Sequence, residues 1–361
     1  MLFVEHLTLS HFRSHKVARL GLDGRPVVLF GSNGAGKTNV LEAVSLLSPG
    51  RGLRRASADE ITRQPDAIGW KIMATLGGHE LESWSEGGAA RQVKIDGKAS
   101  TQSALGQLVR VLWLIPAMDR LWIEGAEGRR RFLDRMTLSF HPTHAEHSLT
   151  YEKAMRERNR LLKEQVSDPG WYRAVEGRMA EAGEAITTAR TSAVAALMAA
   201  QEDAETAFPS ADLAVTHPDV DLPLTAQDLS AAWADTRGRD LAAGRTLIGP
   251  HRVDMEGTYR AKGVAAKASS TGEQKALLVS LILANARALA ADIGTPPLLL
   301  LDEVSAHLDQ ERQAALYDEI CALGAQAWMT GTGAELFAAL GDRAQYFEVG
   351  ETDGQSEIRA Q

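Results

Sequence analysis

A phosphate-binding loop near the start of the chain limits the fold more than any other feature of the sequence. Residues Gly31-Ser32-Asn33-Gly34-Ala35-Gly36-Lys37-Thr38 match the pattern G-x-x-x-x-G-K-[ST]. An apolar strand pattern, Val27 to Phe30, precedes the loop, and a helical pattern, Lys37 to Leu47, follows it. This order of strand, glycine loop and helix predicts nucleotide binding on an α/β fold.

The loop residues have separate expected roles. Glycines let backbone N–H groups surround phosphate oxygens, Lys37 reaches the outer phosphates, and Thr38 ligates Mg²⁺. We expect the following residues to bind the nucleotide: Ser32, Asn33, Gly34, Ala35, Gly36, Lys37, Thr38 and Asn39. The predicted ligands are therefore ATP and Mg²⁺.

A second apolar strand pattern supplies the acids that such a site needs. Pro297-Leu298-Leu299-Leu300-Leu301 runs directly into Asp302 and Glu303. We expect Asp302 to hold Mg²⁺ through water, and Glu303 to be the general base that orients and deprotonates the attacking water. The alternative is a buried strand whose end reaches solvent at two acids. P-loop kinases and small GTPases do not normally carry the second acid.

Two further segments extend the predicted site. Ser269-Ser270-Thr271-Gly272-Glu273-Gln274-Lys275 opens an apolar helix and offers a second helix N-terminus. It makes sense as a contact to the nucleotide of another subunit, through Ser270, Thr271, Gly272 and Gln274, although a plain helix cap is the alternative. Ser305-Ala306-His307-Leu308-Asp309 follows the two acids as a loop, in which Ser305 and Asp309 are the candidate residues.

Taken in order, these segments resemble the ABC-type ATPase heads, with their signature, Walker B strand and D-loop. The start of the chain, Leu7-Thr8-Leu9-Ser10-His11-Phe12-Arg13-Ser14-His15, is similar to the SMC-like branch, in which the region of Arg13 touches nucleotide phosphates. The chain is too short for a coiled-coil arm. Its arginine-rich segment at residues 129–134, the region 151–163 and the block Gly249-Pro250-His251-Arg252-Val253-Asp254 narrow the resemblance to the RecF family of DNA replication and repair proteins.

The resemblance implies a protein that binds and slowly hydrolyses ATP. It also implies that the protein forms a homodimer when ATP is bound. It also implies binding to duplex and single-stranded DNA at gap junctions. RecO and RecR are the implied partners, in recombinase loading, replication-fork maintenance and SOS induction. The implied fold is a P-loop ABC-type core, with a mixed sheet and an antiparallel β subdomain, plus an inserted α-helical lobe. We expect residues 1–118 and 244–361 to form the core and residues 119–243 the lobe.

The sequence departs from general ABC heads at three positions. Glu273 stands where transporters carry a second glycine, and Thr330-Gly331-Thr332 occupies the place of the switch histidine. This fits a slow ATPase without a histidine switch. A Q-loop glutamine is not obvious in the sequence, and Gln64 is a candidate for it. A transporter ATPase subunit and a scaffold that binds ATP without hydrolysing it remain alternatives.

Cysteine usage and charge bear on location and partners. A single cysteine, Cys321, and the lack of an obvious export signal or membrane anchor predict a cytoplasmic protein. The net charge of −8 is uneven, because residues 300–361 carry twelve acids against three arginines. We therefore expect DNA to meet the N-terminal sheet and the lobe. The candidate contacts are arginines in two clusters: Arg51, Arg54, Arg55, Arg129, Arg130 and Arg131.

Overall fold

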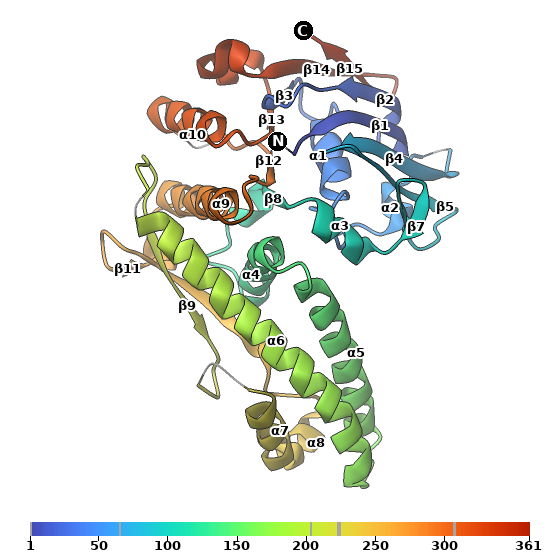
Figure 1. Ribbon diagram of the computed structural model, residues 1–361, viewed down its shortest axis with the longest axis vertical. Helices are drawn as coiled ribbons and strands as arrows, with labels where there is room; N and C mark the ends of the chain where they lie inside the picture. The colour runs from blue at the N-terminus through green and yellow to red at the C-terminus, as the bar shows by residue number, and fades with distance from the viewer. Residues whose placement is uncertain (1, 65, 203, 222–224, 306–307) are drawn as a thin grey trace. The chain divides into compact units, whose positions relative to one another are not determined.

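The computed structural model describes residues 2–64, 66–202, 204–221, 225–305 and 308–361. The chain divides into two compact units (Figure 1). The first contains residues 1–119, 200–210 and 270–361, and the second contains residues 120–199 and 211–269. The expected boundary at residue 243 therefore lies too early, because residues 244–269 belong to the second unit.

A mixed sheet forms the centre of the first unit. Its strand order is β15-β14-β3-β13-β12-β8, and all neighbouring pairs are parallel except β14 with β15. Strand β13 thus lies between the strand that leads into the phosphate loop and the strand that ends at the two acids. The strands are β3 (Val27–Phe30), β8 (Val111–Leu114), β12 (Leu298–Leu301), β13 (Ala327–Gly331), β14 (Gln345–Thr352) and β15 (Gln355–Ala360).

An antiparallel sheet forms the other layer of the first unit, in the order β2-β1-β4-β5-β6-β7. Gly77-Gly78 and Asp96-Gly97 make two of its turns, and all four residues have the positive φ that tight two-residue hairpin turns favour. Its strands are β1 (Val4–Phe12), β2 (His15–Gly21), β4 (Gly69–Leu76), β5 (His79–Glu86), β6 (Gln92–Ile95) and β7 (Lys98–Ser100). Two short helices accompany it, α2 (Ala58–Ile61) and α3 (Gln102–Leu108).

The main core of the first unit lies between these sheets, around helix α1 (Lys37–Ser45). Apolar residues of α1, among them Val40, Leu41 and Val44, pack with the inward side chains of both sheets. Helices α9 (Thr271–Ile293) and α10 (Gln310–Leu323) lie on the opposite face of the mixed sheet from α1 (Figure 1). The predicted class, a P-loop ABC-type core with a mixed and an antiparallel sheet, is confirmed.

Helix α9 also meets the length and composition of a membrane span. It is the one such helix in the described part of the chain, and 67% of its most apolar window is buried inside the protein. Burial of this degree is typical of a core helix, which needs apolar residues on every side.

The second unit is mainly helical, but it also contains a small sheet that the sequence did not predict. Strand β9 (Ala211–Thr216) pairs along its length with β10 (Asp254–Tyr259), and β11 (Val264–Ala265) joins the far side. The pairing holds residues 254–265 in this unit, which explains the misplaced boundary. The helices are α4 (Ala126–Phe140), α5 (His144–Lys163), α6 (Pro169–Glu202, its last turn in the first unit), α7 (Ala226–Asp235) and α8 (Arg237–Ala243).

The Gly249-to-Asp254 block forms a turn in the second unit, in which Gly249, Pro250 and Val253 are buried. Gly249 has a φ of +137°, and the Pro250 carbonyl accepts a hydrogen bond of 2.7 Å from Arg190. The His251 ring lies 2.8 Å from the Tyr151 hydroxyl through Nδ1 and 3.1 Å from the Thr246 carbonyl through Nε2. Nε2 therefore carries the proton, and Nδ1 accepts from the tyrosine. Burial lowers the pKa of His251 to about 4, with Arg252 and Arg130 acting in the same direction.

This histidine predicts a loss of stability in mild acid. The pKa of His251 is about 4 in the folded chain, against an ordinary value of about 6.5 when unfolded. The unfolded state therefore binds more protons as the pH falls below about 6.5, and the free energy of unfolding should fall by about 2 kcal/mol between pH 7.5 and pH 5. Urea denaturation at the two pH values should show this fall in the wild type and a smaller one in His251→Gln. Equal falls in both proteins would contradict the assignment, and His79→Gln, at an exposed histidine, is the control.

Candidate functional site

The phosphate loop connects β3 to α1 at the carboxyl end of the mixed sheet. Gly36 has a φ of +103°, and a Cβ atom there would lie 2.7 Å from the Ser14 hydroxyl. Only glycine fits this backbone position without strain. The Gly31 amide donates to the Gly331 carbonyl of β13 at 3.3 Å, and the buried His15 ring contacts the Gly36 carbonyl at 3.1 Å.

Lys37 lies within the loop, where its side chain is largely buried. Its ammonium donates to the carbonyls of Gly31 at 2.7 Å and Ser32 at 2.8 Å. Burial lowers the pKa of Lys37, and the carboxylates of Glu303 and Asp302 oppose that shift. A cation at a helix N-terminus, where backbone N–H groups also favour anions, is suited to bind phosphate oxygens.

The two acids lie directly after β12, and Asp302 meets the phosphate loop. The Thr38 hydroxyl donates to Asp302 at 2.9 Å, although 264 positions separate the two residues. Asp302 is 7% exposed, whereas Glu303 is exposed. The Thr38 hydroxyl and the Asp302 carboxylate are hard oxygen donors, and Mg²⁺ is bound through one or two carboxylates together with substrate phosphates. These residues therefore fit the predicted ion.

Arg13 and Asn39 lie beside the loop but are held by other side chains. Arg13, whose φ is +54°, forms a bidentate pair with the buried Glu42 at 2.9 and 2.8 Å. Arg54, expected to contact DNA, instead donates to Asn39 at 2.7 Å and to Glu42 at 3.0 Å. Glu42 thus organises two arginines next to the nucleotide-binding loop, and the sequence pattern gave no signal for this role.

The signature segment forms the N-terminus of α9 and is closed by a capping box. The Ser270 backbone amide donates to Glu273 at 2.9 Å, and the Ser270 hydroxyl accepts from the Glu273 amide at 3.4 Å. Glu273 therefore caps the helix, which explains the acid at this position. Ser270 and Thr271 are exposed and Gly272 is half-buried, whereas Gln274 is buried and faces away from solvent.

Lys275 connects this helix to the acids. Its buried ammonium lies 3.6 Å from an oxygen of Asp119 and 3.5 Å from the Glu303 carbonyl. Its position as the last residue of the signature segment is the signal that could have identified it.

The predicted D-loop residues make contacts within the first unit. Ser305 is buried, and its hydroxyl lies 2.9 Å from the Tyr317 hydroxyl. Asp309 caps α10 by accepting from the Arg312 amide at 2.8 Å. Ala306 and His307 lie outside the described residues. Gln64 is exposed in a turn after α2.

The remaining candidate DNA arginines differ in how far their charge is neutralised. Arg51 and Arg55 are exposed in the first unit. In the second unit, Arg129 forms a bidentate pair with Asp254, with both contacts at 2.7 Å, and Arg131 pairs with Glu127. Arg130 donates to the Val253 carbonyl at 3.0 Å, and burial lowers its pKa. Arg129 and Arg131 thus already have acidic partners.

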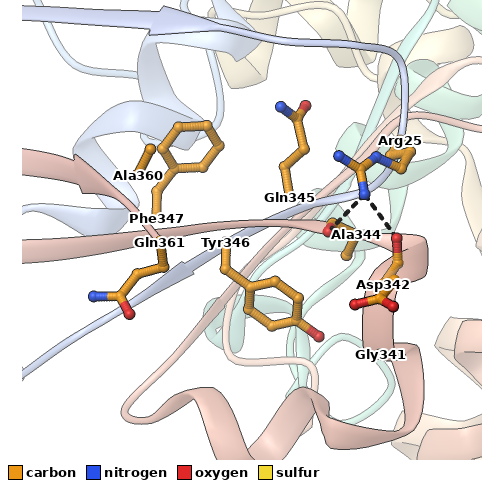
Figure 2. Close-up of a pocket in the computed structure, with 9 residues that line it drawn as sticks. All are labelled: Arg25, Gly341, Asp342, Ala344, Gln345, Tyr346, Phe347, Ala360 and Gln361. Carbon is orange, nitrogen blue, oxygen red and sulfur yellow. Dashed lines mark hydrogen bonds between the residues drawn. The ribbon is translucent and has the colours of Figure 1, made fainter.

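A pocket of about 240 Å³ lies elsewhere in the first unit, beside β14 (Figure 2). The Arg25 guanidinium in its wall donates to the Asp342 carbonyl at 2.7 Å and to the Ala344 carbonyl at 3.5 Å. Its described lining residues include none of the predicted site residues. The candidate nucleotide site, at the phosphate loop and the two acids, therefore does not include this pocket.

Comparison with characterised proteins identifies near full-length relatives. The chain is 47% identical over 366 aligned positions to the DNA replication and repair protein RecF of Rhizobium etli, covering 96% of this chain and 97% of the relative. It is also 47% identical to the protein of the same name from Agrobacterium fabrum, with 96% of each chain covered. No protein-family model matches the sequence.

Solved structures share the fold at lower identity. A structure of the recombination mediator protein RecF with ATP in the RecFOR pathway has a TM-score of 0.82 and 22% identity, covering 100% of this chain and 99% of that one. The Smc head domain of Pyrococcus furiosus has a TM-score of 0.58 and 15% identity, with 100% and 96% covered. The SMC-like fold that the sequence predicts is therefore confirmed.

Proposed function

This chain belongs to the RecF family of DNA replication and repair proteins, and we propose that it is a slow ATPase. In this proposal the chain forms a homodimer when it binds ATP, and the dimer binds DNA. The contact between Thr38 of the phosphate loop and Asp302 of β12, at 2.9 Å, is the observation that carries the ATPase proposal. It joins the two halves of a nucleotide site from opposite ends of the chain. The solved relative named with ATP has the same fold.

We assign a separate role in ATP binding and hydrolysis to each residue of the site. Lys37 and the loop amides bind the outer phosphates, while Thr38 and Asp302 hold Mg²⁺, which when bound neutralises charge on the phosphate oxygens. Glu303 accepts a proton from the attacking water. We assign a slow rate, because no histidine stands at the switch position, where the sequence has Thr330-Gly331-Thr332.

Dimerisation follows from the exposed N-terminus of α9. Ser270 and Thr271 present a hydroxyl-rich helix end to solvent, and helix N-termini favour anions. The phosphate loop already supplies donors for the chain's own nucleotide, so this second anion site is suited to a partner's nucleotide. Glu303, exposed in the single chain, would be shielded from water in such a dimer.

DNA binding is proposed mainly through exposed cations that have no acidic partner among the described residues. On α5, Arg156, Arg160 and Lys163 are exposed and lie within an arc of about 60°, given 3.6 residues per turn. Arg156 is 3.9 Å from Glu152, and Arg160 and Lys163 have no ion-pair partner among the described residues. This basic face of α5 is a better candidate for phosphate contacts than the paired Arg129 and Arg131. Arg51 and Arg55, exposed in the first unit, are separate candidates.

The cellular role follows from family membership. The solved relative is named as a recombination mediator of the RecFOR pathway. We propose that this chain likewise works with RecO and RecR at single-strand gaps, in recombinase loading, replication-fork maintenance and SOS induction. We place it in the cytoplasm, where the DNA lies and where a single cysteine stays reduced.

Gel filtration with and without ATP tests the ATP-gated dimer. Glu303→Gln should lower the hydrolysis rate by about 10²-fold or more, as expected for loss of a general base, and should accumulate as an ATP-bound dimer. Ser270→Arg should still bind ATP but remain a monomer. The proposal fails if neither the wild type nor Glu303→Gln shifts toward a dimer. Unchanged repair activity of Glu303→Gln in cells would instead favour the non-hydrolysing scaffold.

Salt dependence of DNA affinity tests the basic face. If Arg160 and Lys163 each neutralise a phosphate, the double variant Arg160→Gln/Lys163→Gln should reduce the slope of log K against log[salt] by roughly 0.9 per contact on duplex DNA. Arg131→Gln is the matched control, because Glu127 already neutralises that charge. If the slope changes in Arg131→Gln but not in the double variant, the phosphate contacts lie on α4 and not on α5.

A further inference from the structure

Thr330 lies on β13, the strand between β3, which leads into the phosphate loop, and β12, which ends at the two acids. It is opposite Leu29 of β3, while the preceding Met329 lies opposite Leu301 of β12. Because the strands are parallel, their carboxyl ends meet at one edge, so Thr330 is next to Asp302. Its side chain is fully buried.

The Thr330 hydroxyl makes two hydrogen bonds. It donates to Oδ1 of Asp302 at 2.7 Å and accepts from the backbone amide of Glu303 at 2.9 Å. A hydroxyl has one hydrogen to donate, so that hydrogen is committed to the carboxylate. One oxygen atom therefore joins the side chain of the first acid to the backbone of the second.

The backbone of Glu303 needs such support. Its φ is +49°, in the left-handed region that residues with a side chain rarely adopt. Such conformations persist where the surrounding structure holds them, and they occur at active sites. The contacts in this structure are the Thr330 hydroxyl on the Glu303 amide and, more loosely, the Lys275 ammonium 3.5 Å from the Glu303 carbonyl.

We propose that Thr330 is a positioning residue for hydrolysis: its hydroxyl fixes the Asp302 carboxylate and sets the backbone conformation that directs Glu303 toward the attacking water. This inference rests on the proposed ATPase function. Thr330 needs no contact with the nucleotide for this role, unlike a general base or a phosphate ligand. It offers a way for the chain to order its acids without a histidine at this place in the sheet.

Steady-state kinetics of Thr330→Val and Thr330→Ser separate positioning from binding. Valine keeps the shape but removes the hydroxyl, so kcat should fall roughly 10-fold or more while KM and the Kd for ATP stay within about 3-fold. Serine restores the hydroxyl and should restore kcat. Thr332→Val, at an exposed position directly after β13, is the matched control. In a Glu303→Gln background, Thr330→Val should add little further loss, because residues that act as a unit are non-additive.

Hydrogen exchange supplies a readout that needs no bound nucleotide. The Glu303 amide should exchange faster in Thr330→Val than in the wild type and at the wild-type rate in Thr330→Ser. If Thr330→Val does not fold, Thr330→Cys makes the same comparison, because a thiol is a weak donor and acceptor.

The outcomes separate a failure of the role of Thr330 from a failure of the proposed ATPase function. A wild-type rate no faster than that of Glu303→Gln overturns the proposed ATPase and this inference with it. A hydrolysing wild type matched by Thr330→Val overturns the role of Thr330 alone. So does an equal loss in Thr330→Val and Thr330→Ser, or a loss confined to KM.

Discussion

The Asp302 carboxylate is the group on which the site depends. It accepts hydrogen bonds from Thr38 at 2.9 Å and from Thr330 at 2.7 Å, and thereby joins the phosphate loop, β13 and the end of β12. A buried carboxylate is costly unless charge or hydrogen bonds compensate it. Here hydroxyls and the nearby Lys37 provide compensation, and a bound cation would add more.

The order of strands explains how residues so far apart in the sequence come together. The β3-β13-β12 order places the phosphate loop and the two acids at the ends of the strands on either side of β13, with Thr330 of β13 between them. α9 then brings Lys275 to the Glu303 carbonyl from the opposite face. Lys275 lies about one helical turn after Ser270 and Thr271, the residues proposed to meet a partner's nucleotide. Helix α9 therefore connects that proposed contact to the backbone of Glu303, the proposed general base.

Local patterns predicted the parts of the structure that depend on local interactions. Val27–Phe30 and the capped start of α9 follow from residues close together in sequence. The contact of Asp302 with the phosphate loop spans 264 positions, and it was expected only because the two motifs occur together in one chain. Other pairings of distant residues could not be predicted. Strand β10 pairs with β9, although residues 217–253 separate the two strands. Arg129 pairs with Asp254, and Glu42 accepts hydrogen bonds from both Arg13 and Arg54. Thr330 was visible only as a residue in the place of a histidine.

The Mg²⁺ dependence of ATP binding, measured by calorimetry on the wild type and Asp302→Asn, tests the role of the Asp302 carboxylate most directly. Asparagine keeps the shape and can still accept from Thr38 and Thr330, but it removes the negative charge that a metal ion requires. The account predicts that Mg²⁺ strengthens ATP binding to the wild type and has little effect on Asp302→Asn. The same Mg²⁺ dependence in both proteins would contradict the central role of this carboxylate.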